Sequence, residues 1–296
     1  MNRRKAELAL LGNTVIWGTT FVLVKSSLRL ISPVLFLAIR FSLAAVALAV
    51  LFGISRKWRT AKPPRVTAKT VGAGAVIGVF LFGGYLLQTM GLQTTTPPKS
   101  AFLTGLATVM VPLLGALVYQ TKPQISEVAG VLLATLGMGL MTLEGPLGSI
   151  ARGDLLTFGG AIAFSAHIVA TGHFAEQIGY QMLSITQVAS AALSALSLVW
   201  WVEVPRIQWE PLVVWAILIT GLLCTALAFT IQAWAQHYTT STRTALIYAL
   251  EPVVAWITSF ALMGEGLSGR AAAGAVLILS GVLLVEMKPF NPRQHL

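Results

Sequence analysis

The sequence predicts an all-α polytopic membrane protein, in which ten transmembrane helices form two inverted five-helix repeats around a central cavity. Three observations predict this fold. The composition is 56% hydrophobic and only 10% charged, apolar segments of about 20 residues follow one another, and one polar-then-apolar stretch returns 144 positions later. Soluble domains are about 25% charged. So few charges cannot cover a water-exposed surface, and we expect the chain to lie in a lipid bilayer.

The charge balance and the ends of the apolar segments indicate how the chain sits in the membrane. The formal net charge is +10, but the cations lie between apolar segments, which favours basic cytoplasmic loops and no nucleic-acid partner. The opening segment MNRRKAELALLGNTVIWG resembles a signal peptide, yet its apolar run continues past Ser26 without a small-residue cleavage site. We therefore expect a first span that is retained.

Charges and clusters of Pro, Gly and Ser divide the chain into ten apolar segments. Helices are expected because unpaired backbone groups are not tolerated in lipid. With the first residue inside, thirteen Lys and Arg lie on that side against six on the other, so both termini are predicted to be cytoplasmic. The expected spans are approximately residues 8–27, 33–54, 69–91, 99–119, 124–143, 153–174, 180–202, 212–236, 242–262 and 270–288.

The internal repeat follows from two similar stretches, 88–112 and 232–252. Each has a Thr-rich elbow, one cation (Lys99 or Arg243) and an apolar run with a proline (Pro112 or Pro252). The cations are 144 positions apart but the prolines 140, so the first copy holds about one extra helical turn. The predicted repeats are residues 1–148 and 149–296. Five spans each is an odd number, which places the two copies in opposite orientations.

Four stretches of the chain carry a resemblance to a known family. They are NTVIWGTTFVLVK at 13–25, Pro33 with Arg40 and Phe41, TTPPKSAFLTGLATVMVPLLG at 95–115, and TRTALIYALEPVVAWITSFALMGEGLS at 242–268. Through them the chain resembles the drug/metabolite transporter superfamily, in its ten-helix EamA-type branch. The resemblance covers essentially the whole chain. It implies two inverted five-helix repeats around a cavity and export of small metabolites, among them amino acids. One departure is Lys122-Pro123-Gln124, where the family often has a Gly-Glu pair.

No pattern in the sequence predicts an enzyme, a metal site or a cofactor. The four histidines lack metal-ligand spacing and there is no CxxC motif. Gly74 and Gly78 form a GxxxG motif within an apolar span, which is typical of close helix packing. A membrane-embedded lipid-modifying enzyme would need clustered acids, and Asp154 is the only aspartate. We therefore expect no catalytic residues.

Polar and aromatic residues inside the spans are the candidates for substrate binding. Each polar group is costly in lipid and so faces a cavity or a partner. Aromatic rings with a few amides and hydroxyls suit a largely apolar pocket. His167 has a second interpretation, a helix-to-helix hydrogen bond. The candidates are Trp17, Phe21, Tyr85, Gln88, Thr104, Phe164, His167, Gln232 and Tyr248.

Five further residues are candidates for gating or structure. Lys99 and Arg243 are predicted on opposite faces, where they could bond helix-end carbonyls or extend to the lipid headgroups. Pro112 and Pro252 each remove a backbone hydrogen bond and bend a helix, as a hinge or a static kink. Glu251 could neutralise a substrate's ammonium group, carry a proton, or bond a structural partner such as a neighbouring hydroxyl.

The function predicted from these features is export of small metabolites across a bacterial-type inner membrane by alternating access. Amino acids with aromatic or hydrophobic side chains are the first expectation, because the candidate residues are mostly uncharged or aromatic. The alternative is a broad exporter of hydrophobic cations with Glu251 as the counter-charge. The expected partners are a small-molecule substrate and the bilayer, with no obligate protein partner.

Overall fold

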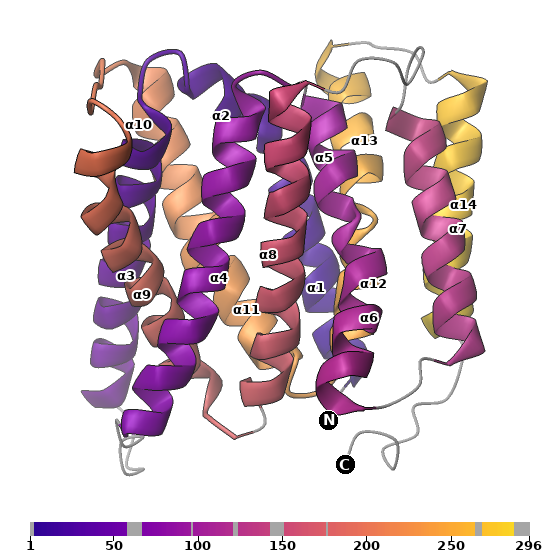
Figure 1. The fold of residues 1–296 in the computed structure, drawn as a ribbon, viewed down its shortest axis with the longest axis horizontal. Coiled ribbons are helices and arrows are strands. Elements are labelled where there is room, and N and C mark those ends of the chain that lie inside the picture. Colours follow the sequence, from indigo (N-terminus) through magenta and orange to yellow (C-terminus); the bar gives the residue numbers. More distant parts are fainter. Residues whose placement is uncertain are drawn as a thin grey trace.

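The protein is a bundle of long helices that run side by side in Figure 1. The computed structural model describes residues 3–57, 67–95, 97–120, 124–142, 151–175, 177–263 and 268–286. Within these ranges, β structure is limited to one isolated antiparallel bridge between Ile31 and Ile207. The predicted all-helical class is therefore confirmed for the described part of the chain.

The described residues of the first half of the chain form seven helices. In order, they are α1 (Arg3–Gly18), α2 (Phe21–Ser27), α3 (Pro33–Lys57), α4 (Ala68–Leu92), α5 (Pro97–Gly105), α6 (Ala107–Tyr119) and α7 (Ile125–Thr142). The second half contains α8 (Arg152–Ala175), α9 (Tyr180–Val202), α10 (Pro211–Leu218), the π-helix η1 (Ile219–Leu227), α11 (Ala228–Ala235), α12 (Ser241–Tyr248), α13 (Glu251–Met263) and α14 (Gly269–Glu286).

Seven helical segments of the described chain are long and apolar enough to cross a membrane. They are Arg3–Ser27, Pro33–Gly53, Ala68–Leu92, Ser100–Tyr119, Arg152–Ala175, Tyr180–Val202 and Pro211–Ala235. Two shorter apolar helices, Ile125–Leu140 and Gly269–Val285, match the expected fifth and tenth spans. The expected span at 242–262 corresponds to α12 and α13, which a break divides.

The first predicted span is also interrupted, between α1 and α2. The Thr20 hydroxyl donates to the Trp17 carbonyl at 2.9 Å, and the Thr19 hydroxyl donates to the Ile16 carbonyl at 3.0 Å. Threonine hydroxyls bonded in this way compete with the helical ladder. The segment remains one apolar unit that is interrupted at these two residues.

The breaks near the two prolines differ from the sequence expectation. In the first copy, α5 and α6 are separated at Leu106, and the helix then continues through Pro112. In the second copy, the break lies at Ala249–Leu250, and Pro252 sits in the first turn of α13, where its missing N–H is not needed. Leu106 and Leu250 are 144 positions apart. The two interruptions therefore share the 144-residue offset, whereas the two prolines are 140 positions apart.

Glycines allow the helices of the bundle to approach closely. A Cβ on Gly74 would lie 2.1 Å from the Thr186 hydroxyl oxygen, and one on Gly78 would lie 2.4 Å from the Gln187 backbone oxygen. The GxxxG motif thus packs α4 against α9, as predicted. On the other side of the molecule, α7 packs along α14, and a Cβ on Gly137 would meet the Gly274 backbone oxygen at 2.5 Å.

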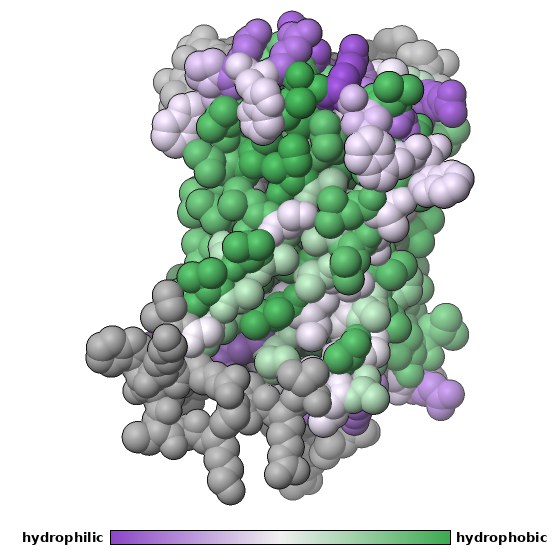
Figure 2. Space-filling model, turned by 90° about the vertical axis from the view of Figure 1, so that its left-hand side faces the viewer, coloured by the Kyte–Doolittle hydropathy of each residue, from purple (hydrophilic) through white to green (hydrophobic). Residues whose placement is uncertain are grey.

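The outer surface is apolar, as a protein surrounded by lipid requires. Figure 2 shows a hydrophobic band below a hydrophilic rim on the face it presents. Four tryptophans around the end of α9 and the start of α10, Trp200, Trp201, Trp209 and Trp215, have 60–86% of their surface exposed. Exposed tryptophans at a span end are typical of the membrane–water interface.

Candidate functional site

A cavity in the middle of the helix bundle brings the predicted substrate-binding residues together. Its empty space, including the part that opens to solvent, is about 880 Å³. Side chains from α1 to α6, α8 and α11 to α13 line it. All nine candidates lie in its wall: Trp17, Phe21, Tyr85, Gln88, Thr104, Phe164, His167, Gln232 and Tyr248.

Aromatic rings form a connected part of the cavity wall. The Trp17 ring lies 4.8 Å from the Tyr248 ring and 5.5 Å from the Phe229 ring. Tyr85 meets Phe164 edge to face at 5.0 Å and Phe229 at 6.1 Å. Such tilted contacts are the preferred geometry of aromatic pairs. Phe229 was missed in the sequence, although it lies 144 positions after Tyr85 and the repeat offset could have found it.

Polar side chains of α1 fix this wall to the second half of the chain. The Trp17 indole N–H donates to the Cys224 carbonyl at 2.9 Å. One turn earlier, Asn13 donates to the Ala228 carbonyl at 2.8 Å and to the Tyr248 hydroxyl at 3.3 Å. Cys224 belongs to the π-helix η1, a rare helix type that is frequently found at functional sites. Asn13 was not among the sequence candidates.

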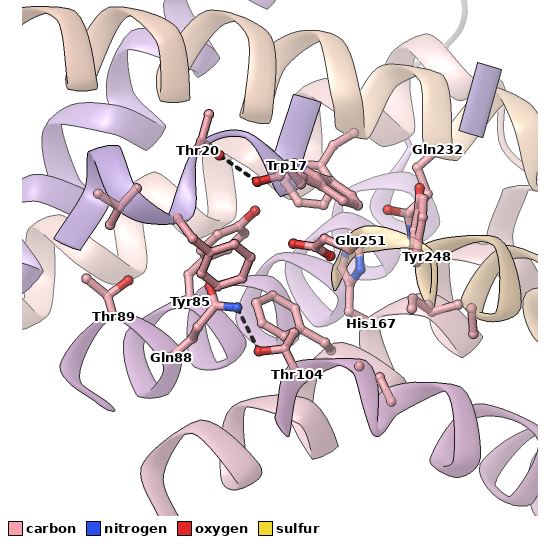
Figure 3. A pocket seen from close by; sticks show the side chains of 18 of the residues that line it. Trp17, Thr20, Tyr85, Gln88, Thr89, Thr104, His167, Gln232, Tyr248 and Glu251 are labelled. Atoms are coloured by element: carbon pink, nitrogen blue, oxygen red, sulfur yellow. Dashed lines mark hydrogen bonds between the residues drawn. The ribbon is translucent and has the colours of Figure 1, made fainter. Parts of the chain in front are cut away.

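The two predicted glutamines are held by protein partners as well as facing the cavity. Gln88 donates from its amide nitrogen to the Thr104 hydroxyl at 2.9 Å (Figure 3). Gln232 donates to the Gln236 side chain at 3.0 Å. Each amide therefore has a fixed orientation before a ligand arrives.

His167 combines the two interpretations that its sequence position allowed. Its Nε2 lies 2.9 Å from the Gln187 amide oxygen, which joins α8 to α9, and the ring also borders the cavity (Figure 3). The helix-to-helix hydrogen bond is therefore present. A role of the ring in ligand binding stays a prediction.

Arg40 is a cavity residue that the list of sequence candidates omitted. Its side chain is only 3% exposed, its Nε donates to the Thr225 hydroxyl at 2.8 Å, and its guanidinium lies 4.2 Å from the centre of the Tyr85 ring. Cation–π contacts of this kind are strengthened by desolvation. The position of Arg40 within an apolar span was the signal in the sequence.

Glu251 also lines the cavity, and its carboxylate points into the cavity (Figure 3). Across the described part of the chain, this carboxylate has no hydrogen-bond or ion-pair partner. The structural partner expected as one option from the sequence, a neighbouring hydroxyl, is therefore not found there.

Of the two predicted gate cations, Arg243 is described and meets a carboxylate. Its Nη1 lies 3.5 Å from the Glu7 carboxylate, which also accepts hydrogen bonds from Arg3 at 2.8 Å and Thr239 at 3.4 Å. The side chain is buried and does not extend away from the protein to headgroups. The Lys99 side chain lies outside the described residues.

At the other end of the bundle, a second carboxylate also accepts a hydrogen bond from a threonine. The Thr95 hydroxyl donates to the Asp154 carboxylate at 2.6 Å, and the second oxygen of Asp154 accepts from the Ala151 N–H at 2.9 Å. Lys25 donates to the carbonyls of Leu92 and Thr95. In the described ranges, no group of three or more His, Cys, Asp or Glu side chains could hold a metal ion.

Comparison with known proteins identifies the family. The model of the EamA-like transporter family matches the chain twice, over residues 4–143 and 151–287. The chain belongs to the EamA-like transporter family. The family resemblance of the sequence is thereby confirmed, and the protein is a membrane transporter.

Relatives of this EamA-like transporter match it along nearly its whole length. An uncharacterized transporter of Archaeoglobus fulgidus is 33% identical, with 97% of this chain and 88% of the relative covered. A probable amino-acid metabolite efflux pump of Salmonella typhimurium is 27% identical, with 96% and 95% covered. A solved crystal structure shares the fold with a TM-score of 0.76 at 22% identity, over 95% of this chain and 96% of the other.

Proposed function

We propose that this EamA-like transporter exports amino acids with aromatic or hydrophobic side chains across a bacterial-type inner membrane. The observation that carries the proposal is the cavity wall, which combines a connected set of aromatic rings with a few oriented amides and hydroxyls. An indole or phenyl ring would pack against the aromatic side chains, and the polar groups would orient its amino-acid end. The name of the Salmonella relative, a probable amino-acid metabolite efflux pump, agrees with this substrate class.

The proposed mechanism is alternating access between two inverted repeats of five spans each, with both termini cytoplasmic. Aromatic contacts in the cavity support the repeat. Trp17 and Phe164 are 147 positions apart, and Tyr85 and Phe229 are 144 apart. The contacts Trp17–Phe229 and Phe164–Tyr85 therefore join the same two repeat positions. In the first contact, the earlier position comes from the first half of the chain, and in the second contact it comes from the second half. A pseudo-twofold axis through the cavity accounts for both.

Contacts at the two ends of the bundle support the same mechanism. Glu7 and Asp154 are 147 positions apart, and Thr239 and Thr95 are 144 apart. Thr239 bonds Glu7 across the halves, and Thr95 bonds Asp154 across the halves. Alternating access requires an equivalent closure at each face, and this pair of contacts supplies related groups for it.

The proposed function is tested by flux into proteoliposomes that contain the purified protein. Labelled phenylalanine and tryptophan should enter saturably, and unlabelled substrate should compete. Liposomes without protein supply the background rate. Flux that does not saturate, or that unlabelled substrate fails to reduce, would remove amino acids from the proposal.

A second candidate function is export of hydrophobic cations, and the position of Glu251 in the cavity favours it. A carboxylate without a partner among the described side chains could serve as the counter-charge of a cationic drug. The substitution Glu251→Gln would then abolish cation efflux and leave amino-acid flux intact. Loss of both fluxes together contradicts this candidate.

A further inference from the structure

Glu251 differs from the other carboxylates of the described chain in what its oxygens contact. Glu7 bonds Arg3, Asp154 bonds Thr95, and Glu127 and Glu203 accept backbone N–H groups. Glu210 is exposed to solvent. Among these described side chains, Glu251 alone is placed in the cavity wall with neither a protein partner nor an exposed position.

A carboxylate at this depth calls for a partner of opposite charge. Removing an ionised group from water without a partner is costly in a membrane protein. Arg40, the cation of the cavity wall, is not this partner, because its Nε donates to Thr225 and its guanidinium stacks on Tyr85. The structure gives Arg40 no ion pair with Glu251. The partner of Glu251 is therefore expected to come from the cavity.

The surroundings of Glu251 select the kind of cation. Trp17 and Tyr248 form an aromatic pair in the same wall, and Figure 3 shows Glu251 pointing into the space beside them. Aromatic faces attract organic ammonium groups. A divalent metal ion would need several oxygen ligands, and no second acid of the described chain joins Glu251 in the cavity wall.

We propose that Glu251 binds the ammonium group of the transported molecule, and that a positively charged amine is the feature that every substrate of this transporter carries. The assignment rests on the proposed function in taking this cavity as the substrate site. It goes further by naming the charge that the cavity selects and the atoms that select it.

The carboxylate can be altered without disturbing the backbone around it. A Cβ on Gly18 would lie 2.9 Å from the Glu251 backbone oxygen and 3.0 Å from the Val254 Cβ. The start of α13 therefore packs on α1 through backbone and Val254 contacts that do not involve the carboxylate. Glu251→Gln keeps the side-chain shape and removes only the charge.

The first experiment uses the wild-type protein in proteoliposomes and measures competition against labelled phenylalanine. Two competitors share the phenyl ring: phenethylamine carries the ammonium group without a carboxylate, and 3-phenylpropionate carries the carboxylate without an ammonium group. Phenethylamine should compete at a concentration at least tenfold lower than 3-phenylpropionate. Equal competition by the two compounds would overturn the assignment.

The second experiment compares Glu251→Gln with Glu127→Gln, which makes the same chemical change at the start of α7, outside the cavity. Glu251→Gln should weaken phenethylamine competition at least tenfold, and Glu127→Gln should match the wild type. If Glu251→Gln does not yield folded protein, Glu251→Asp keeps the charge on a shorter side chain and should retain the preference for phenethylamine over 3-phenylpropionate. Loss of that preference in a folded Glu251→Asp protein contradicts the proposal.

The outcomes separate this inference from the proposed function. Saturable flux of labelled phenethylamine that depends on Glu251, without phenylalanine flux, would remove the amino-acid function and support the ammonium assignment. Phenylalanine flux that is unchanged in Glu251→Gln would leave the amino-acid function in place and overturn the ammonium assignment.

Discussion

The Thr95 hydroxyl donates a hydrogen bond to the Asp154 carboxylate at 2.6 Å and thereby joins the end of α4 to the start of α8. A Cβ on Gly153 would lie 2.4 Å from the Gly91 backbone oxygen, so the two helices approach closely at the same place. The related contact at the other end, from Thr239 to Glu7, is longer at 3.4 Å. The two ends of the transporter are thus held by related contacts of unequal length.

Removing the two hydroxyls should therefore have unequal effects. Thr95→Val keeps the side-chain shape and removes a hydrogen bond to a charged group, which stabilises by about 1.5–3 kcal/mol. Thr239→Val removes a longer and weaker contact, and we expect a smaller loss. Unfolding of both variants in detergent micelles measures the difference. An equal or larger loss for Thr239→Val would contradict the inequality of the two ends.

The packing of Gly84 against Phe164 predicts a sharp contrast between neighbouring glycines. A Cβ on Gly84 would lie 2.7 Å from the Phe164 ring, whereas one on Gly83 would have its nearest neighbour 3.9 Å away. Gly84→Ala should displace the ring in the cavity wall, lower the free energy of unfolding by about 1–3 kcal/mol and reduce transport. Gly83→Ala is the control in the same helix and should keep wild-type flux. Similar flux in the two variants would show that Phe164 adjusts without consequence.

Trp17 has two roles that substitutions can separate. Trp17→Phe retains a ring but loses the indole hydrogen bond to the Cys224 carbonyl, and the free energy of unfolding should fall by roughly 0.5–1.5 kcal/mol. Trp17→Ala also removes the ring that contacts Tyr248 and Phe229. If the ring contacts a transported aromatic side chain, KM should rise about two- to tenfold, as expected for the loss of an aromatic pair.

Kinetics on the two Trp17 variants provide the control. KM in Trp17→Phe should stay close to the wild type, because a ring remains in the cavity wall. A KM for phenylalanine that is unchanged in Trp17→Ala would place the substrate away from this wall.

Arg40 should not tolerate replacement by lysine. A lysine keeps the charge but lacks the planar group that lies 4.2 Å from the centre of the Tyr85 ring and the Nε that donates to Thr225. We expect Arg40→Lys to lower the free energy of unfolding by about 1–3 kcal/mol. The control is Lys69→Arg, the reverse substitution at an exposed position in the first turn of α4. If Arg40→Lys is as stable as the wild type, a positive charge alone is sufficient for stability at this position of the cavity wall.

Much of the site could be predicted because two independent signals coincide in the sequence. Tyr85, Gln88 and His167 are polar groups within apolar spans, and Gln88 and Gln232 also hold matching positions in the two copies. A polar group in lipid needs a cavity or a partner, so its depth in the span is informative by itself. The repeat offset also relates Phe229 to Tyr85, because the two residues are 144 positions apart.

Other features could not be predicted because they depend on contacts between distant parts of the chain. The break at Leu106 could not be separated from Pro112 by composition. The hydrogen bond of the Arg40 Nε is made to the hydroxyl of Thr225, 185 residues away in the sequence. Asn13 appears as an ordinary polar residue near the start of the first span until the Ala228 carbonyl is placed beside it.

The sequence by itself determined the helical membrane class, the repeat offsets and the nine candidate side chains that meet in one cavity. These properties follow from hydropathy and spacing, which are local or periodic along the chain. The tertiary structure decided which of the cavity's charged groups already has a partner within the protein. Arg40 has its partners within the protein, and Glu251 has none in the described part of the chain. The physical reason is that each partner is fixed by helix packing across the two halves rather than by neighbours in sequence.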